Sequence, residues 1–147
     1  MGSHLKILHI IDSGGLYGAE MVLLNLCAEQ IRLGHHPVIA SIGATGEGQK
    51  PLETEATKQG IDTTVFRISN GPNILGAMRI LKYADRNGFK IMHSHGYKGD
   101  ILIGFTPRSM RIIPLVTTIH GWTNVDRISK LRLYEWLDGI SLRFIDA

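Results

Sequence analysis

The chain has 147 residues, of which 44% are hydrophobic and 20% charged, a balance typical of one soluble globular domain. Its single cysteine, Cys27, excludes a disulfide within the chain, and no apolar run reaches the length of a membrane-spanning helix. The formal net charge is +3, without the clustered basic stripe expected of a protein that binds nucleic acid.

After residues 1–4, which resemble the remnant of an expression tag, short apolar runs alternate with segments of helical periodicity. In chain order, the pattern predicts a strand at Leu5–Ile11, a helix at Ala19–Leu33, a strand at Pro37–Ile42, a helix at Leu52–Gln59, a strand at Thr63–Ile68, a helix at Ile74–Arg86, a strand at Lys90–Ser94, a helix at Tyr97–Phe105, a strand at Leu115–Ile119 and a helix at Ile128–Leu142. This alternation at short spacing is typical of a parallel sheet covered by helices on both faces. Residues 5–147 are therefore predicted to form one three-layer, Rossmann-like α/β domain with a mostly parallel sheet.

A sixth strand is predicted to open at Arg143–Asp146, close to the end of the sequence. We therefore expect this domain to be the first part of a longer protein, with a second domain following it.

Three glycines, Gly14, Gly15 and Gly18, separate the first predicted strand from the helix that follows. Ligands of open parallel sheets bind beyond the carboxyl ends of the strands, and a glycine loop before a helix can approach a phosphate or a sugar hydroxyl. A tight turn without a ligand is the alternative. The loop lacks the G-x-G-x-x-G spacing of a dinucleotide site and the Gly-Lys-Ser/Thr of a P-loop, which argues against hydride transfer and nucleotide hydrolysis.

Histidines also follow the fourth and fifth predicted strands, as His95 and His120, each with a glycine after it. In the common doubly wound order these strands lie beside the first, so both histidines would share an edge with the glycine loop. A neutral imidazole there can bind a sugar hydroxyl or a phosphate oxygen, although a structural hydrogen bond explains either histidine alone.

The histidines do not by themselves predict a metal site. His93 would share a strand face with His95, but no acid or cysteine at ligand spacing joins this pair. His9, in the middle of the first strand, is interpreted as structural. We therefore expect neither a bound metal nor a cofactor.

Other polar residues begin the helices at this edge. Glu20 lies in the first helical turn after the glycine loop, where it can complement the helix dipole or bind acceptor hydroxyls. Tyr97, Lys98 and Asp100 follow His95 and can line the same edge.

The second half of the chain is the more basic one, with eleven lysines and arginines against six acids in residues 74–147. This excess is compatible with an anionic ligand or an anionic membrane surface. Trp122 and Trp136, near Arg127 and Lys130, can rest on a membrane interface, although ordinary helix packing is the simpler explanation. We expect a cytoplasmic protein with, at most, peripheral contact with the inner face of the membrane.

Three motifs resemble retaining glycosyltransferases of the GT-B fold, family four (group one). They are Gly-Gly-Leu-Tyr-Gly-Ala-Glu at residues 14–20, His-Ser-His-Gly at 93–96 and Val-Thr-Thr-Ile-His-Gly at 116–121. Each motif is weak alone, but the three occur in the right order over nearly the whole chain.

The resemblance implies an N-terminal, acceptor-side domain that faces a donor-binding domain across a cleft. Gly14 and Gly15 would approach the donor phosphates or the acceptor, and His120 would lie beside the transferred sugar. His95 and Glu20 would lie near the acceptor. Because the groups that grip the nucleotide belong to the second domain, this chain alone is expected to transfer no sugar. The donor would be a nucleoside-diphosphate sugar and the acceptor a hydroxyl of a sugar, a lipid-linked sugar or a small molecule.

Two other functions remain open at this point. The chain can be a non-catalytic sugar- or nucleotide-binding module on the same fold. It can also belong to another GT-B enzyme, such as a sugar-nucleotide epimerase, but that class would be expected to place more acids at the strand ends.

Overall fold

The computed structural model describes residues 4–69, 73–120, 136, 140, 145 and 146. Five parallel strands form one sheet in the order β3-β2-β1-β4-β5. The strands are β1 (Lys6–Ile11), β2 (His36–Ala44), β3 (Asp62–Ile68), β4 (Ile91–His95) and β5 (Leu115–Thr118). The order reverses between β1 and β4, which is where ligands bind in doubly wound sheets.

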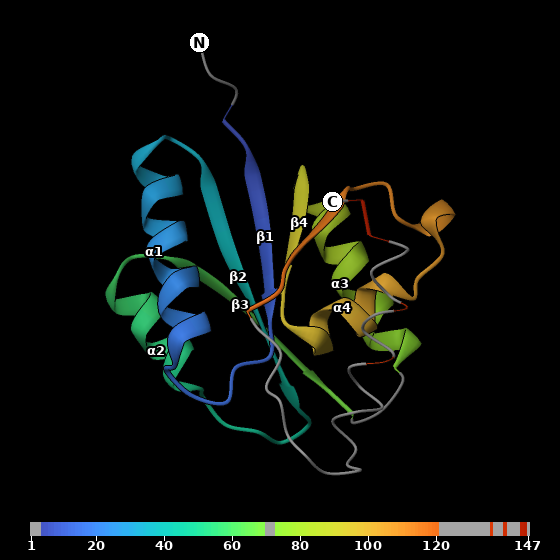
Figure 1. Ribbon diagram of the computed structural model, residues 1–147, viewed down its shortest axis with the longest axis horizontal. Helices are drawn as coiled ribbons and strands as arrows, with labels where there is room; N and C mark the ends of the chain where they lie inside the picture. Colours follow the sequence, from blue (N-terminus) through green and yellow to red (C-terminus); the bar gives the residue numbers. More distant parts are fainter. Residues whose placement is uncertain (1–3, 70–72, 121–135, 137–139, 141–144, 147) are drawn as a thin grey trace.

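Helices cover both faces of the sheet and form three layers with it (Figure 1). On one face lie α1 (Gly18–Arg32) and α2 (Pro51–Lys58), and on the other lie α3 (Ile74–Arg86) and α4 (Tyr97–Gly104). A short 3-10 helix, η1 (Arg108–Met110), leads toward β5. The predicted Rossmann-like α/β architecture with a parallel sheet is confirmed.

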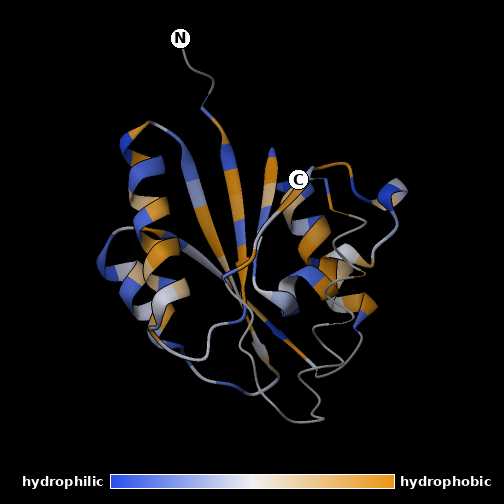
Figure 2. Ribbon diagram, viewed as in Figure 1, coloured by the Kyte–Doolittle hydropathy of each residue, from blue (hydrophilic) through white to orange (hydrophobic). Residues whose placement is uncertain are grey.

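Each face of the sheet has its own apolar core (Figure 2), because successive residues of a strand point to opposite faces. Under α1 and α2 the buried set is Ile11, Leu23, Leu24, Cys27, Ile39, Leu52, Ala56 and Ile61. The larger core under α3 and α4 includes Leu8, Ile10, Phe66, Ile80, Met92 and Leu115. Burying one such large side chain stabilises the fold by about 1.5–3 kcal/mol, so both faces contribute.

Helix α4 packs very closely on β4. A Cβ atom at Gly99 would lie 2.6 Å from the Oγ of Ser94, so this position has no room for a side chain. Gly96, between β4 and α4, has φ +87°, a backbone conformation that glycine adopts without strain. Together these two glycines set how the chain leaves β4.

Most predicted bounds differ from the observed ones by one or two residues, and Pro37 gives the one instructive error. It was expected at the first position of its strand, but β2 begins at His36. The His36 N–H donates to the Leu5 carbonyl on the β1 side, so the nitrogen of Pro37 faces β3. Pairing with β3 starts only at Val38, so the missing N–H of Pro37 interrupts no hydrogen bond.

The predicted helix Ile128–Leu142 lies outside the described residues except for positions 136 and 140. Of the predicted sixth strand, only Ile145 and Asp146 are described. The N–H of Asp146 donates to the carbonyl of Leu115 at 2.9 Å, which places that residue beside β5.

Candidate functional site at the switch between β1 and β4

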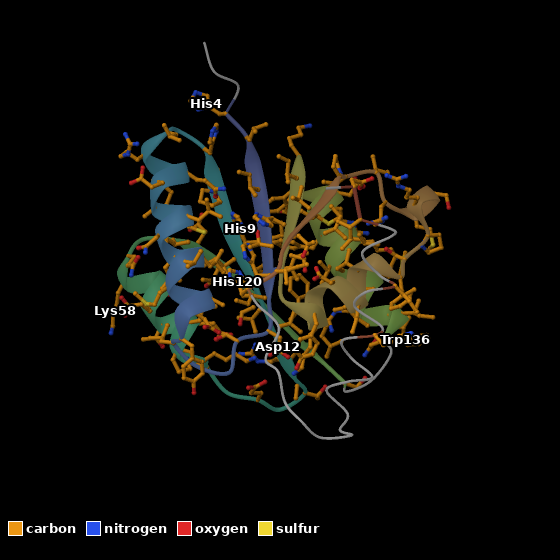
Figure 3. All side chains as sticks on the ribbon, viewed as in Figure 1. His4, His9, Asp12, Lys58, His120 and Trp136 are labelled. Atoms are coloured by element: carbon orange, nitrogen blue, oxygen red, sulfur yellow. The ribbon has the colours of Figure 1, made fainter. Side chains whose placement is uncertain are left out.

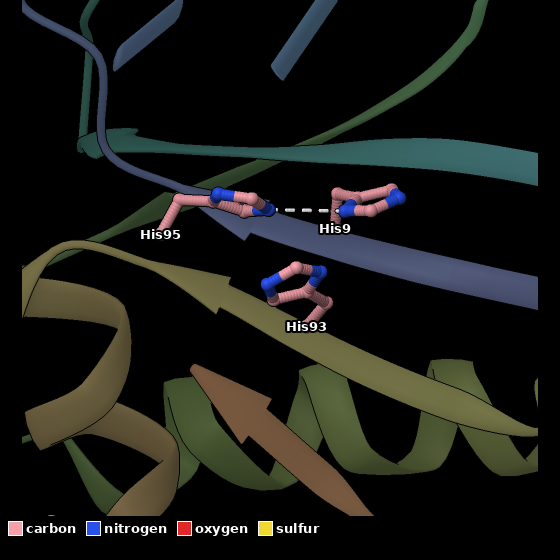
Figure 4. Close-up of side chains that lie close together, drawn as sticks. All are labelled: His9, His93 and His95. Atoms are coloured by element: carbon pink, nitrogen blue, oxygen red, sulfur yellow. Dashed lines mark hydrogen bonds between the residues drawn. The ribbon is translucent and has the colours of Figure 1, made fainter. Parts of the chain in front are cut away.

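Strand register gathers three histidines on the α1 face of the sheet. In the pairing of β1 with β4, His9 lies opposite His93 and Ile11 lies opposite His95. Because side chains alternate along a strand, His93 and His95 share a face, and His9 joins them there. The close-up in Figure 4 shows the three rings together on one side of the two strands.

A chain of hydrogen bonds, called the file below, connects Gln30, His9, His95 and His120. The Nε2 atom of His9 lies 2.8 Å from Oε1 of Gln30 in α1, and its Nδ1 lies 3.0 Å from Nε2 of His95. The Nδ1 atom of His95 lies 3.1 Å from Nε2 of His120, directly beyond β5. His93 stands beside the file, with its Nε2 atom 2.7 Å from Oγ1 of Thr118 and its ring centroid 4.2 Å from that of His95.

Burial keeps the buried histidines uncharged. It is the largest cause that lowers the pKa of His9 to about 4 and the pKa of His95 to about 2, with neighbouring histidines acting in the same direction. Burial also lowers the pKa of His93. No carboxylate contributes to any of these three shifts within the part of the chain described, so at neutral pH the three rings are neutral imidazoles.

His9, His93 and His95 are also the group best suited to hold a metal ion among the described residues. Each offers one ring nitrogen, and these atoms lie within 4.8 Å of one another. Neutral imidazole is the form that binds zinc, but His9 and His95 use the facing nitrogens for their mutual hydrogen bond. The group contains neither a carboxylate nor a thiolate within the described ranges. The absence of a metal therefore stays a prediction.

The glycine loop lies at the carboxyl end of β1, as predicted. The described backbone has no positive φ at Gly14, Gly15 or Gly18, so backbone conformation does not demand glycine there, but a Cβ atom at Gly15 would lie 2.7 Å from the ring of Tyr17. Ser13 holds the turn, because its Oγ donates to the Gly15 carbonyl at 2.7 Å and lies 3.3 Å from the Gly15 nitrogen. Nothing lies within 4 Å of a Cβ built at Gly14 or Gly18, so both are bordered by open space.

Asp12, labelled in Figure 3, connects this loop to two lysines from other parts of the chain. Its Oδ1 accepts from Nζ of Lys50 at 2.7 Å, and its Oδ2 accepts from Nζ of Lys98, in the first turn of α4, at 2.5 Å. Burial raises the pKa of Asp12, but the two lysines outweigh burial, and the pKa lies below its ordinary value. The loop after β1 and the first turn of α4 thus meet at one edge of the sheet.

For two other predicted site residues, Glu20 and Tyr97, the structure gives less support for a role in binding. Glu20 is buried, and its Oε2 accepts from the Tyr17 backbone N–H at 3.0 Å, which caps the start of α1. This geometry favours the structural interpretation of Glu20 over acceptor binding. Tyr97 is half-buried at the first position of α4, beyond His95. Trp122, Arg127 and Lys130 lie outside the described residues, whereas Trp136 is exposed.

The sequence interpretation missed two members of the file. His9 was taken as structural and Gln30 was not singled out. The repeated appearance of histidine on neighbouring strands was the available signal, but only the register of β1 against β4 shows that His9 faces His93.

A family model for Glycosyltransferase Family 4 matches residues 17–147. The chain belongs to glycosyltransferase family 4. The match includes β4, β5, His95 and His120, and it begins after Gly14 and Gly15. Among curated protein sequences, none matches the chain.

Two solved structures share the fold of this family 4 chain. HepE of Anabaena, solved in complex with UDP, superposes with a TM-score of 0.72 at 17% identity, over 96% of this chain and 36% of that one. A glycosyltransferase from Rickettsia africae superposes with a TM-score of 0.64 at 20% identity, over 97% of this chain and 35% of that one. The family 4 chain thus spans about a third of the length of these proteins.

The helices in the described part of the chain include none with the length and apolar character needed to span a membrane.

Proposed function

We propose that this family 4 chain is the N-terminal, acceptor-side domain of a retaining glycosyltransferase. The enzyme would move a sugar from a nucleoside-diphosphate sugar to a hydroxyl acceptor. The observation that carries the proposal is the hydrogen bond between His95 and His120 at the carboxyl edge of the sheet, where β1, β4 and β5 end side by side. Family membership and the UDP bound by HepE of Anabaena support a nucleotide-linked donor.

The residues at this edge differ in solvent exposure, and we assign their roles accordingly. His120 is exposed and joined to the buried His95, so it is the imidazole that can reach the transferred sugar. The open space beside Gly14 and Gly18 suits a phosphate or a hydroxyl that approaches the backbone. We assign substrate binding also to Tyr97, which begins α4 after His95, whereas Glu20 supports the region through the cap of α1.

Sugar transfer of this kind breaks the bond between the anomeric carbon and the diphosphate oxygen and forms one to the acceptor oxygen, and the proton of the acceptor hydroxyl is released to solvent. The diphosphate leaves with added negative charge, and stabilising that charge is usually the largest catalytic contribution. We assign this task to a second, donor-binding domain, and we assign no metal or cofactor to the domain described here. The 147-residue chain alone would then be inactive.

The proposal is tested by expressing the full-length gene product and measuring release of nucleoside diphosphate from a panel of nucleoside-diphosphate sugars. The His120→Ala variant is expected to lose about tenfold or more in kcat/KM, because it removes a hydrogen bond to the transferred sugar. His36→Ala is the matched control, because His36 is an exposed histidine at the start of β2, at the opposite end of the sheet, and is paired with Asp62. NMR of the product's anomeric configuration tests retention.

Three results would count against the proposal. They are robust turnover by the 147-residue chain alone, full activity of His120→Ala, and failure of the full-length protein to turn over any donor. The last result, together with measurable sugar or nucleotide binding, would favour a non-catalytic binding module.

A further inference from the structure

The hydrogen-bonded file from Gln30 to His120 has a direction. A neutral imidazole carries one proton on two nitrogens, so one nitrogen donates and the other accepts. The side-chain oxygen of Gln30 can only accept, and it lies 2.8 Å from Nε2 of His9. With Oε1 of Gln30 facing it, His9 donates from Nε2, which leaves its Nδ1 as an acceptor.

The same reasoning passes along the file to its exposed end. His9 Nδ1 accepts at 3.0 Å, so His95 carries its proton on Nε2 and accepts through Nδ1. His95 Nδ1 in turn lies 3.1 Å from Nε2 of His120, so His120 donates from Nε2. When neutral, His120 then has an unprotonated Nδ1, which can accept a hydrogen bond.

Packing keeps the file in place. His9 and His95 are almost fully buried, and the ring of His93 lies with its centroid 5.1 Å from that of His9 and 4.2 Å from that of His95. His93 is itself held by Thr118 of β5. Neither His9 nor His95 can turn over without breaking the buried hydrogen bond between them, which is costly.

We propose that Gln30 and His9 are positioning residues that act through His95 to hold His120 as the Nε2–H tautomer, with Nδ1 presented to a sugar hydroxyl. A hydroxyl can donate to this nitrogen, whereas a phosphodiester or diphosphate oxygen, which carries no proton at neutral pH, cannot. The ligand part of the inference rests on the proposed function, but the tautomer part does not. His120 thus recognises a hydroxyl of the sugar and not the phosphates of the donor.

The tautomers are measured by long-range 15N–1H NMR correlations of the histidine rings in the uniformly 15N-labelled 147-residue chain at neutral pH, in the presence of EDTA. We expect His9, His95 and His120 each to carry the proton on Nε2. A proton on Nδ1 of His120 would overturn the inference, because it would mean that the file runs in the opposite direction.

Two substitutions of Gln30 should disturb the fold little, because its side chain is only half-buried on α1. Gln30→Glu keeps an acceptor and is expected to leave the His120 nitrogen shifts unchanged. Gln30→Met removes the acceptor at similar size and is expected to move them toward those of a free imidazole in tautomeric exchange. Gln59→Met, on the exposed end of α2, is the control for the substitution itself. Identical His120 shifts in Gln30→Met and the unmodified chain would contradict a role for Gln30.

A zinc titration separates this file from a metal site built on the same rings. Coordination would use the ring lone pairs that the hydrogen bonds occupy. We expect one equivalent of zinc chloride to leave the His9, His93 and His95 signals unchanged. Stoichiometric shifts of all three would overturn the inference in favour of a zinc site.

The ligand part is tested in the full-length enzyme. Gln30→Met is expected to lower kcat/KM for the donor by about tenfold, the size of one hydrogen bond, and Gln30→Glu to leave it unchanged. If the tautomer changes and kcat/KM does not, His120 does not recognise a hydroxyl in the reaction. If no activity is found in any variant, the proposed function fails while the NMR result on the tautomer still stands.

Discussion

Lys50 and Asp12 form a buried ion pair, with Nζ 2.7 Å from Oδ1 and the two side chains 4% and 16% exposed. The same Nζ donates to the carbonyl of Ile42 at 2.6 Å, at the end of β2. One ammonium group therefore joins the loop after β1 to the loop after β2. This connection therefore holds the start of the glycine loop of the candidate site in position.

Lys50→Met is expected to destabilise the fold by about 2 kcal/mol, because the buried Ile42 carbonyl loses its donor and Asp12 keeps only its ion pair with the exposed Lys98. Lys58→Met removes an exposed lysine in α2 that pairs with Glu55, and should cost less than about 0.5 kcal/mol. Urea denaturation of both variants measures the difference. Equal losses of stability in the two variants would mean that the buried ion pair stabilises the fold no more than the exposed pair does.

The buried histidines predict a loss of stability in mild acid. Their pKa values are lowered in the folded chain, to about 4 for His9 and about 2 for His95, so the unfolded chain binds more protons below pH 6.5. The contribution of these two neutral histidines to the free energy of unfolding is complete above about pH 6.5 and declines as the pH falls. Each should cost about 2 kcal/mol between pH 7 and pH 5.

Chemical denaturation at a series of pH values checks this slope, and His9→Gln should make it shallower by the share of one histidine. A free energy of unfolding that stays constant from pH 7 to pH 5 would show that the rings accept protons without leaving the fold.

Gly14→Ala separates a ligand-binding glycine from a turn glycine. Gly14 has no positive φ and open space beside it, so the substitution should change stability by less than about 0.5 kcal/mol. If a ligand approaches the backbone there, the methyl group should weaken donor or acceptor binding in the full-length enzyme. Gly48→Ala, another uncrowded loop glycine, is the control for both measurements. Unchanged binding in Gly14→Ala would leave the loop as a simple turn.

Glu20 can be assigned to capping or to binding by comparing two substitutions. Glu20→Ala loses the acceptor for the Tyr17 N–H and should cost about 1 kcal/mol, measured by thermal or urea denaturation. Glu20→Gln keeps an acceptor oxygen and should cost distinctly less. If both variants are fully stable but the full-length enzyme loses acceptor binding, the capping interpretation is wrong.

Much of the fold could be predicted because its signals are local. The helix Ile74–Arg86 was predicted with its observed bounds, since an apolar stripe marks it and a glycine follows it. His95 and His120 were predicted to share one edge of the sheet, because both were expected to follow strands that are neighbours in the usual order, and the structure joins them by a hydrogen bond. These predictions needed only periodicity and topology.

The remainder depended on information that is absent from local patterns. His9 joins the site through its register with His93, and a shift of one residue would turn it to the other face. Lys50 looks like an ordinary loop lysine in the sequence, yet it is buried because a carboxylate 38 residues away and a strand-end carbonyl both face it. Glu20 was ambiguous until its hydrogen bond to the N–H of Tyr17 was known.

The absence of a side chain at Gly99 has a mechanical consequence. With no side chain to act as a cushion, α4 and β4 are in direct contact next to Ser94, one residue from His95. His95 points to the opposite face of β4, toward α1, so a ligand that displaces its ring does not act on α4 through this contact. Helix α4, with Tyr97 and Lys98 at its start, should shift only together with β4.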